Sequence, residues 1–161
     1  MNKIIVGAAI VGALIASNKT RVIESATVRG IRNHNPGNIR ANKIIWDSQT
    51  GIDDAGFAIF KSPEWGIRAL AKLLLNYEKI HGLNTVEGII GRYAPVKENN
   101  TGAYINSVAG SLGVDPYTPF SVGEKLTPLI NAIIKHENGI NPYSAVLIAN
   151  GISLVEGYNY A

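Results

Sequence analysis

Residues 127–139, with the sequence TPLINAIIKHENG, predict a helix in which both ends are marked. Thr127 is a favourable N-cap residue and Pro128 suits the first helical position, because its fixed φ fits the helix and its missing N–H is not needed there. Gly139 supplies the left-handed residue at which helices commonly stop. Three residues at helical spacing form one apolar face of this helix: Ile130, Ile133 and Ile134. We expect the fold to pack around this face.

Glu137 continues this apolar face, because it lies seven residues after Ile130 and three after Ile134. Burial raises the pKa of a carboxyl group, and the negative end of the helix dipole acts in the same direction. A glutamate that stays protonated near neutral pH can act as a general acid. If the helix frays before this point, Glu137 points into water instead. His136 lies about 100° around the helix and is not expected to share the pocket of Glu137.

The other acidic residues fit different roles. Glu64 and Glu124 fall at predicted helix starts, where capping explains an acid. Glu98 precedes another helix start and could orient a site, while Glu24 lies in a polar linker. Three aspartates occupy or flank a turn-rich stretch and are candidates for a second active-site carboxylate: Asp47, Asp53 and Asp54.

Composition excludes several classes of chemistry. The chain has 161 residues, no cysteine and three histidines, so zinc–thiolate sites, disulfides and cysteine nucleophiles are excluded, and we expect neither a metal nor a cofactor. Motifs for serine hydrolysis, phosphate-binding loops, zinc proteases and EF-hands are missing. The net charge of +3 fits an anionic polymer or membrane surface and is too small to indicate nucleic-acid binding.

The N-terminal segment differs from the rest of the chain. Residues 4–16, IIVGAAIVGALIA, are uninterruptedly apolar. As a helix they would span about 20 Å, against about 30 Å for a bilayer core. We favour a short uncleaved membrane anchor over residues 1–20, followed by a linker at 21–28. A cleaved signal segment and a buried helix of a soluble protein are the alternatives, and positive charges on both flanks leave the orientation open.

The pattern of turn residues, apolar runs and capping residues in the rest of the chain predicts an α+β fold that is mainly helical. Residues 29–40 read as a set of turns in which asparagine side chains bond to nearby backbone. A small two-stranded sheet is expected to form from the apolar runs 43–46 and 57–60. Five or six helices follow, with capping residues, apolar spacing and stop signals that place them at about 63–81, 85–93, 101–112, 127–137 and 143–151.

Five ordered segments carry a family resemblance: RGIRNHNPGNIR (29–40), Trp46, FAIFKSPEWGIRAL (57–70), YAPVKENNTGAYI (93–105) and AIIKHENGINPY (132–143). Together they resemble a family of small phage and prophage virion proteins in the lysozyme-like superfamily, described as structural proteins or lytic transglycosylases. The resemblance covers about residues 28–157, which places a lysozyme-like domain at 29–157.

The resemblance implies cleavage of the β-1,4 bond between N-acetylmuramic acid and N-acetylglucosamine in peptidoglycan, with Glu137 as the catalytic residue and Glu98 and Glu24 as alternatives. In lysozyme-like folds the catalytic glutamate ends a helix and a β-hairpin follows it in the chain. Here the hairpin precedes the best glutamate, so the order of the motifs favours a circular permutation. An unpermuted arrangement would instead use Glu24, which stands upstream of the NPGNIR turns.

A transglycosylase needs a single glutamate, because the acetamido group of the substrate can stabilise the oxocarbenium ion. A hydrolase would need a second carboxyl group about 5–5.5 Å or 6.5–9.5 Å away. The predicted sugar contacts are side chains that can hydrogen-bond or stack on a sugar: Asn35, Asn38, Tyr104 and Tyr143.

The expected partners are peptidoglycan glycan strands, the lipid membrane through residues 4–16, and other virion proteins. The expected location is the phage virion, in association with a membrane, or the bacterial inner membrane facing the periplasm. Two other functions stay open: a non-enzymatic virion or membrane protein with a glycan-binding lysozyme-like body, and a muramidase of the endolysin type.

Overall fold

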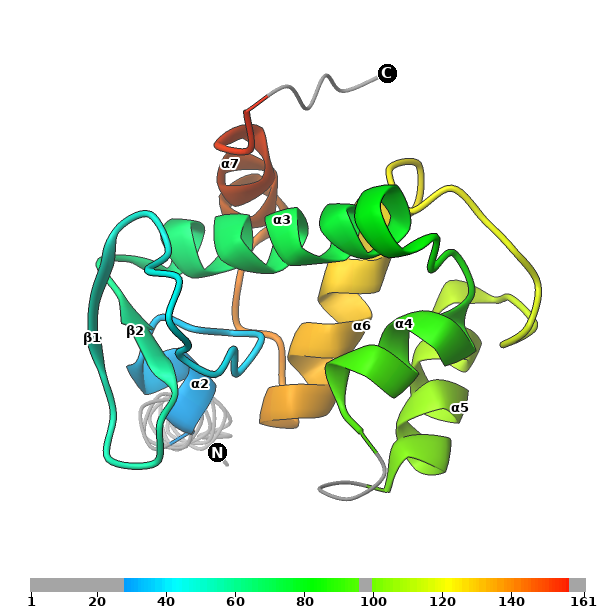
Figure 1. The fold of residues 1–161 in the computed structure, drawn as a ribbon, viewed down its shortest axis with the longest axis horizontal. Coiled ribbons are helices and arrows are strands. Elements are labelled where there is room, and N and C mark those ends of the chain that lie inside the picture. Colours follow the sequence, from blue (N-terminus) through cyan, green and yellow to red (C-terminus); the bar gives the residue numbers. More distant parts are fainter. Residues whose placement is uncertain (1–27, 96–99, 157–161) are drawn as a thin grey trace, which may run out of the picture.

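A computed structural model describes residues 28–95 and 100–156. The proposed anchor at 1–20 with its lipid-binding segment 4–16, the linker before residue 28, and both alternative acids, Glu24 and Glu98, lie outside these residues. The elements follow in the order α2 (Arg29–Arg32), β1 (Gln49–Ile52), β2 (Ala58–Phe60), α3 (Pro63–His81), α4 (Val86–Tyr93), α5 (Thr101–Leu112), α6 (Leu126–Asn138) and α7 (Ala145–Ser153). The predicted mainly helical α+β architecture, with a small sheet before the helices, is confirmed (Figure 1).

The hairpin is present, but its first strand was predicted in the wrong place. β1 and β2 pair in an antiparallel register, with an irregularity between Gln49 and Gly51. The predicted strand at 43–46 is a loop in which Ile44 and Ile45 are 71% and 77% exposed. The apolar run predicted a buried strand, yet no element in the described part of the chain covers these two side chains. Ser48, with a φ of 56°, turns the chain into the polar stretch that pairs with β2.

Helix α3 has the boundaries that the sequence predicts. Ser62 is the N-cap residue, Pro63 opens the helix and Gly82 ends it in the left-handed conformation with a φ of 66°. Its apolar face is completely buried at Ile67 and Leu70. At 19 residues it is the longest helix in the described part of the chain and crosses most of the molecule in Figure 1.

Helix α6 begins one residue before the predicted cap. Lys125 is the N-cap residue, and Thr127 is an exposed residue of the first turn that makes no cap hydrogen bond. Gly139 ends the helix with a φ of 73°, as predicted. The expected apolar face is confirmed, since three side chains are wholly buried: Ile130, Ile133 and Ile134.

Two other helices begin differently from what the capping residues indicate, since the sequence predicts Thr101 as the N-cap of α5. Asn100, rather than Thr101, caps α5 by accepting a hydrogen bond from the backbone N–H of Ala103. The Thr101 hydroxyl instead donates to the carbonyl oxygen of Ala94 and so joins α5 to the end of α4. α7 begins at Ala145 and is capped by Ser144, two residues after its predicted start at Tyr143.

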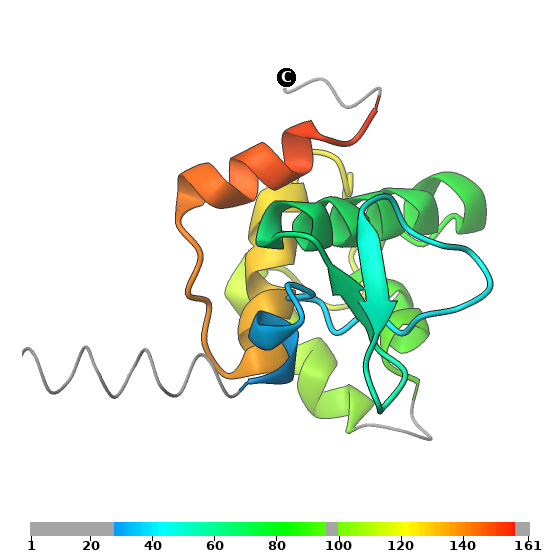
Figure 2. The same cartoon turned by 90° about the vertical axis from the view of Figure 1, so that its left-hand side faces the viewer.

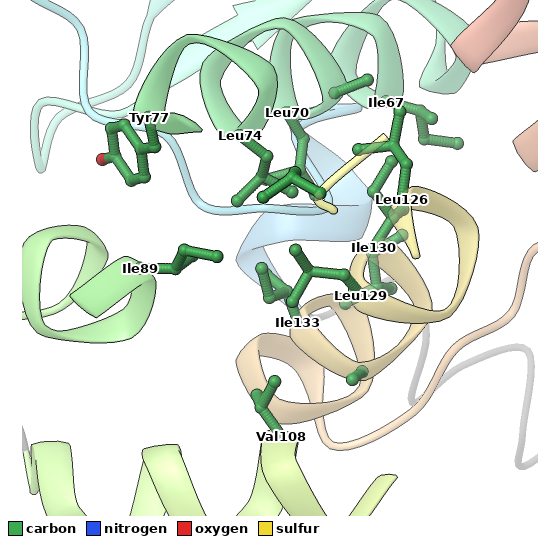
Figure 3. Close-up of a cluster of buried hydrophobic side chains, with 14 of the residues drawn as sticks. Ile67, Leu70, Leu74, Tyr77, Ile89, Val108, Leu126, Leu129, Ile130 and Ile133 are labelled. Carbon is green, nitrogen blue, oxygen red and sulfur yellow. The ribbon is translucent and has the colours of Figure 1, made fainter. Parts of the chain in front are cut away.

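The core lies where α3 crosses α6. Figure 3 shows Ile67, Leu70 and Leu74 of α3 pointing toward Leu129 and Ile133 of α6. The hairpin lies at one end of this pair, α4 and α5 lie at the other, and α7 covers the outer side of α3 (Figures 1 and 2). The fold therefore brings the N-terminal turns beside the C-terminal end of α6. None of the helices in residues 28–95 and 100–156 is both long and apolar enough to cross a membrane.

Candidate functional site

The Asn-rich turns after α2 are held together by Asn35. Its side-chain amide donates to the carbonyl oxygens of Ile39 and Ala58, both at 2.9 Å, and its Oδ1 accepts from the backbone N–H of Ile39. The side chain is completely buried. The prediction that Asn35 contacts substrate is therefore wrong: its polar atoms are used to join the turns to the hairpin.

Asn138 fixes these turns to the end of α6. Its side-chain amide donates to the carbonyl oxygen of Pro36 at 2.7 Å and to that of Ile134 at 2.9 Å. Gly30 of α2 lies against the same side chain, and a Cβ atom added there would collide with Asn138 Oδ1. Sequence reasoning missed Asn138, although its position four residues after Ile134 continues the buried face of the helix.

Glu137 receives a hydrogen-bond donor on each carboxyl oxygen. Asn38 Nδ2 donates to Oε2 at 3.0 Å, and the Tyr104 hydroxyl donates to Oε1 at 2.8 Å. The side chain is half-buried. Asn38 adopts a positive φ of 48°, which turns its amide toward α6. Glu137 therefore lies beside the Asn-rich turns, which is the placement that the proposed site requires.

Tyr104 supports the Glu137 carboxyl group from the buried side. It is only 3% exposed, and burial, followed by the proximity of Tyr93 and Glu137, raises the pKa of its hydroxyl, so this group stays protonated and donates. The ring is stacked on His136 at 3.6 Å between centroids and meets Tyr93 edge to face at 6.5 Å. Tyr104 is thus too buried to be the predicted sugar contact. His136 stays out of the pocket, as expected, yet holds the ring that reaches Glu137.

A cleft with a volume of about 550 Å³ opens in front of Glu137 and Asn38. Its walls come from α2, the turns, the hairpin, α3 and the end of α4. The other described residues that line it are Arg29, Ile39, Arg40, Asn42, Trp46, Phe57, Leu73, Tyr77, Tyr93, Ala94 and Pro95. This mixture of aromatic rings, amides and charged groups can stack on a sugar face and hydrogen-bond to its hydroxyls.

A second cavity, of about 470 Å³, adjoins the first and shares four lining residues with it: Asn42, Trp46, Leu73 and Tyr77. Because these residues line both spaces, the two cavities lie along one face of α3. A linear polymer longer than one sugar pair could therefore follow this face of the molecule.

Tyr143 does not line the cleft that contains Glu137, so the structure does not bring this predicted sugar contact to the site. Its hydroxyl is buried and has no hydrogen-bond partner among the described residues. Burial, with a smaller effect of the nearby Glu64 carboxylate, raises the pKa of Tyr143 to about 12. Of the four predicted sugar contacts, Asn38 is the one that lines the cleft.

The three candidate aspartates do not reach the cleft. Asp53 accepts from the backbone N–H groups of Phe57 and Ala55 and from Asn33 Nδ2, and the Phe57 hydrogen bond is the largest cause that lowers its pKa. Asp47 pairs with Arg68 beside the second cavity. Asp54 is exposed on the hairpin turn. Among residues 28–95 and 100–156, Glu137 is the single acid that lines the cleft.

No cluster of three or more metal-binding His, Asp or Glu side chains occurs in the described part of the chain. The chemistry that the described site offers is therefore that of one carboxyl group, one amide and several aromatic and guanidinium side chains.

Comparison with known proteins gives a match over most of the chain. The sequence is 40% identical over 141 residues to Protein P5 of Pseudoalteromonas phage PM2, and the match covers 85% of this chain and 86% of that protein. No family model matches the chain.

Proposed function

The chain belongs to the family of Protein P5 of Pseudoalteromonas phage PM2, and we propose that it is a lytic transglycosylase of the phage virion. It would cleave the β-1,4 bond between N-acetylmuramic acid and N-acetylglucosamine in peptidoglycan. The observation that carries the proposal is Glu137, a half-buried carboxyl group that faces a sugar-sized cleft at the end of α6.

The chemistry follows from this single carboxyl group. In the protonated state Glu137 donates its proton to the glycosidic oxygen as the bond to C1 of the muramic acid breaks. The acetamido oxygen of the same sugar stabilises the cation that forms. Glu137, now ionised, accepts the proton of the 6-hydroxyl group while O6 bonds to C1, which yields the 1,6-anhydro product. Asn38 and Tyr104 hold the carboxyl group in place between the two steps.

The absence of a second acid from the described cleft favours a transglycosylase over a muramidase. A hydrolase of the usual type places another carboxyl group across the scissile bond. The three aspartates that could supply it are used in the hairpin turn, in the pair with Arg68, or lie exposed outside the cleft. A muramidase of the endolysin type is therefore the weaker alternative.

The same placement supports a lysozyme-like body with permuted chain order. The glutamate ends a helix, and the side of the cleft opposite that helix is formed by turns and a hairpin that come about 100 residues earlier in the chain. In this proposal the virion carries the enzyme to the cell wall, where it acts as the genome enters. Residues 4–16 would attach it to the membrane, and other virion proteins would be its neighbours.

A second candidate function is a non-enzymatic virion protein with a glycan-binding body. One observation favours it: both oxygens of Glu137 already accept hydrogen bonds within the protein. In a purely structural role, these bonds would serve to join α6, α5 and the Asn-rich turns.

The two functions are separated by a zymogram of the full-length chain against purified peptidoglycan. We expect Glu137→Gln to lower the cleavage rate by at least about a hundredfold, since glutamine cannot transfer the proton. Glu87→Gln, at an exposed site on α4, is the matched control and should retain full activity.

Mass spectrometry of the released fragments then tests the reaction type, with anhydro ends expected instead of reducing ends. Unchanged activity in Glu137→Gln would refute the assignment of the catalytic residue. A wild-type chain without activity on several peptidoglycans would support the structural function.

A further inference from the structure

We propose that the second cavity binds the peptide that branches from the muramic acid unit of peptidoglycan, and that Arg92 binds a carboxylate of this peptide. The inference rests on the proposed function, because it specifies which form of the same substrate the molecule accepts. The second cavity, of about 470 Å³, has the volume of a small-ligand site, for which roughly 300–1,000 Å³ is usual.

The position of the second cavity suits a branch of the glycan. Four residues, including Trp46 and Tyr77, line both this cavity and the cleft that contains Glu137, so the two spaces adjoin. In peptidoglycan the peptide is attached through the lactyl ether of the muramic acid, so it leaves the glycan sideways and needs space beside the sugar site. A muramic acid unit in the cleft could therefore place its peptide in the second cavity.

The charge of the second cavity complements such a peptide, which carries free carboxylates. Three positively charged side chains line the cavity: Arg68, Lys72 and Arg92. Asp47 is the single acid among the described lining residues, and it is already paired with Arg68. The remaining positive charge favours a ligand that brings its own carboxylates, which a neutral chain of N-acetylglucosamine does not do.

Arg92 is the best placed of these cations. It is exposed in the last turn of α4, and its guanidinium carbon lies 5.4 Å from the centroid of the Tyr77 ring, which attracts the cation. Within the part of the chain that the structure describes, Arg92 forms no ion pair. Its guanidinium can present N–H groups as a fork, the geometry that suits a carboxylate. Lys72 is the weaker candidate, since it also borders a smaller space lined by Glu78 and Glu156.

The apolar side chains of the second cavity suit the alanine residues of the peptide. Three isoleucines line the cavity and are exposed: Ile44, Ile45 and Ile80. Large apolar side chains grouped on a surface commonly mark a binding site, because a ligand that covers them removes apolar area from water. Asn76 adds an amide that can donate to and accept from a peptide bond. Methyl groups, peptide bonds and carboxylates together are what the peptide of peptidoglycan offers.

The test compares three ligands that differ only in the peptide. The first is the disaccharide of N-acetylglucosamine and N-acetylmuramic acid with its tetrapeptide, the second carries the same peptide with its carboxylates amidated, and the third lacks the peptide. Affinities are measured by calorimetry for the full-length chain with Glu137→Gln, called here the parent chain, so that no ligand is cleaved. We expect the first ligand to bind the parent chain at least about tenfold more tightly than the third.

Added to the parent chain, Arg92→Gln should weaken binding of the first ligand by at least about tenfold, as for a lost charge-assisted hydrogen bond, and should leave the other two unchanged. Ile45→Ser should weaken binding of both ligands with a peptide by about threefold, because an apolar contact is lost. Lys135→Gln is the matched control, since Lys135 is likewise an exposed cation in the last turn of a helix but lines neither cavity. Thermal unfolding of each variant checks that the fold is intact.

Equal affinities of the Arg92→Gln chain and the parent chain for the first ligand would overturn the inference. The same holds if Arg92→Gln weakens binding of all three ligands by one factor, which would indicate a purely structural role, or if the parent chain binds none of them. Failure of the proposed function is read separately from the zymogram: cleavage would persist in Glu137→Gln or be missing from the wild type, whatever the affinities are.

Discussion

Among single residues, Tyr104 best illustrates how a buried side chain determines the geometry of the half-buried Glu137. Glu137 lies on the last turn of α6, where a glutamate side chain can adopt several rotamers. The donors from Tyr104 and Asn38 restrict it to one, with its carboxyl group toward the cleft. Tyr104 is in this sense a positioning residue, since it does not line the cleft itself.

Removal of this hydroxyl tests the role directly. Tyr104→Phe keeps the ring that stacks on His136 but removes the donor to Glu137. We expect kcat on peptidoglycan fragments to fall by about tenfold, with little change in KM, because the loss affects alignment more than binding.

Tyr143→Phe is the matched control, since its buried hydroxyl has no partner in the described residues and its loss leaves no group unsatisfied. That variant should retain its kcat. Equal kcat values for Tyr104→Phe and the wild type would show that the hydroxyl does not align the carboxyl group.

Among the secondary-structure elements, the contact between the short helix α2 and the end of α6 is decisive for the site. α2 has only four residues, which is too short to be stable alone, so it depends on the surface of α6. Gly30 permits the close approach, because an added Cβ would collide with Asn138 Oδ1 and lie 2.9 Å from the carbonyl oxygen of Asn35. The turns that present Asn38 to Glu137 follow directly from this contact.

We therefore expect Gly30→Ala to destabilise the chain by about 1–3 kcal/mol, as overpacking of a tight contact does. We also expect the rate of peptidoglycan cleavage to fall by more than the loss of folded protein would explain, because the turns that carry Asn38 move away from α6. The free energy of unfolding is measured by urea titration.

Gly110→Ala, on the exposed side of α5 with no atom within 4 Å of the added Cβ, is the control. It should stabilise the chain by about 0.5–1 kcal/mol, because alanine favours the helix. A Gly30→Ala chain as stable as the wild type would mean that α2 and α6 can separate without cost.

Across the whole molecule, Arg68 links three regions that are distant in sequence. It is a buried residue of α3, its Nε donates to the carbonyl oxygen of Leu154 at 3.2 Å, and it forms an ion pair with Asp47 in the exposed loop before β1. The guanidinium thus joins the loop between the two cavities to the C-terminal end of α7. The partners differ in burial: the side chain of Arg68 is 10% exposed and that of Asp47 is 62% exposed.

This difference predicts unequal effects on stability. Asp47→Ala leaves a buried guanidinium without its anion and should cost about 1–2 kcal/mol, whereas Arg68→Met leaves an exposed carboxylate that water can solvate and should cost less. The double variant should be close to Arg68→Met alone, and urea unfolding of all four chains gives the coupling energy. A larger loss for Arg68→Met would show that the bond to Leu154 matters more than the ion pair.

The helical part of the fold and the importance of Glu137 could both be predicted from the amino-acid sequence. Proline, glycine and hydrophobic spacing act within a few residues of the chain, so the ends of α3, the stop of α6 and the buried isoleucines could be read without a structure. The same local pattern singled out Glu137.

The polar side chains that surround Glu137 could not be predicted in the same way, because they depend on how distant segments pack. Asn35 and Asn38 lie three residues apart in the same turns, yet one is buried in backbone hydrogen bonds and the other reaches α6. The exposure of Ile44 and Ile45, the contact of Tyr104 with Glu137 and the proximity of Arg29 to Arg40 likewise depend on segments far apart in the chain. Local sequence patterns do not predict such distant contacts, because the burial and the hydrogen-bond partners of a side chain depend on how the helices pack.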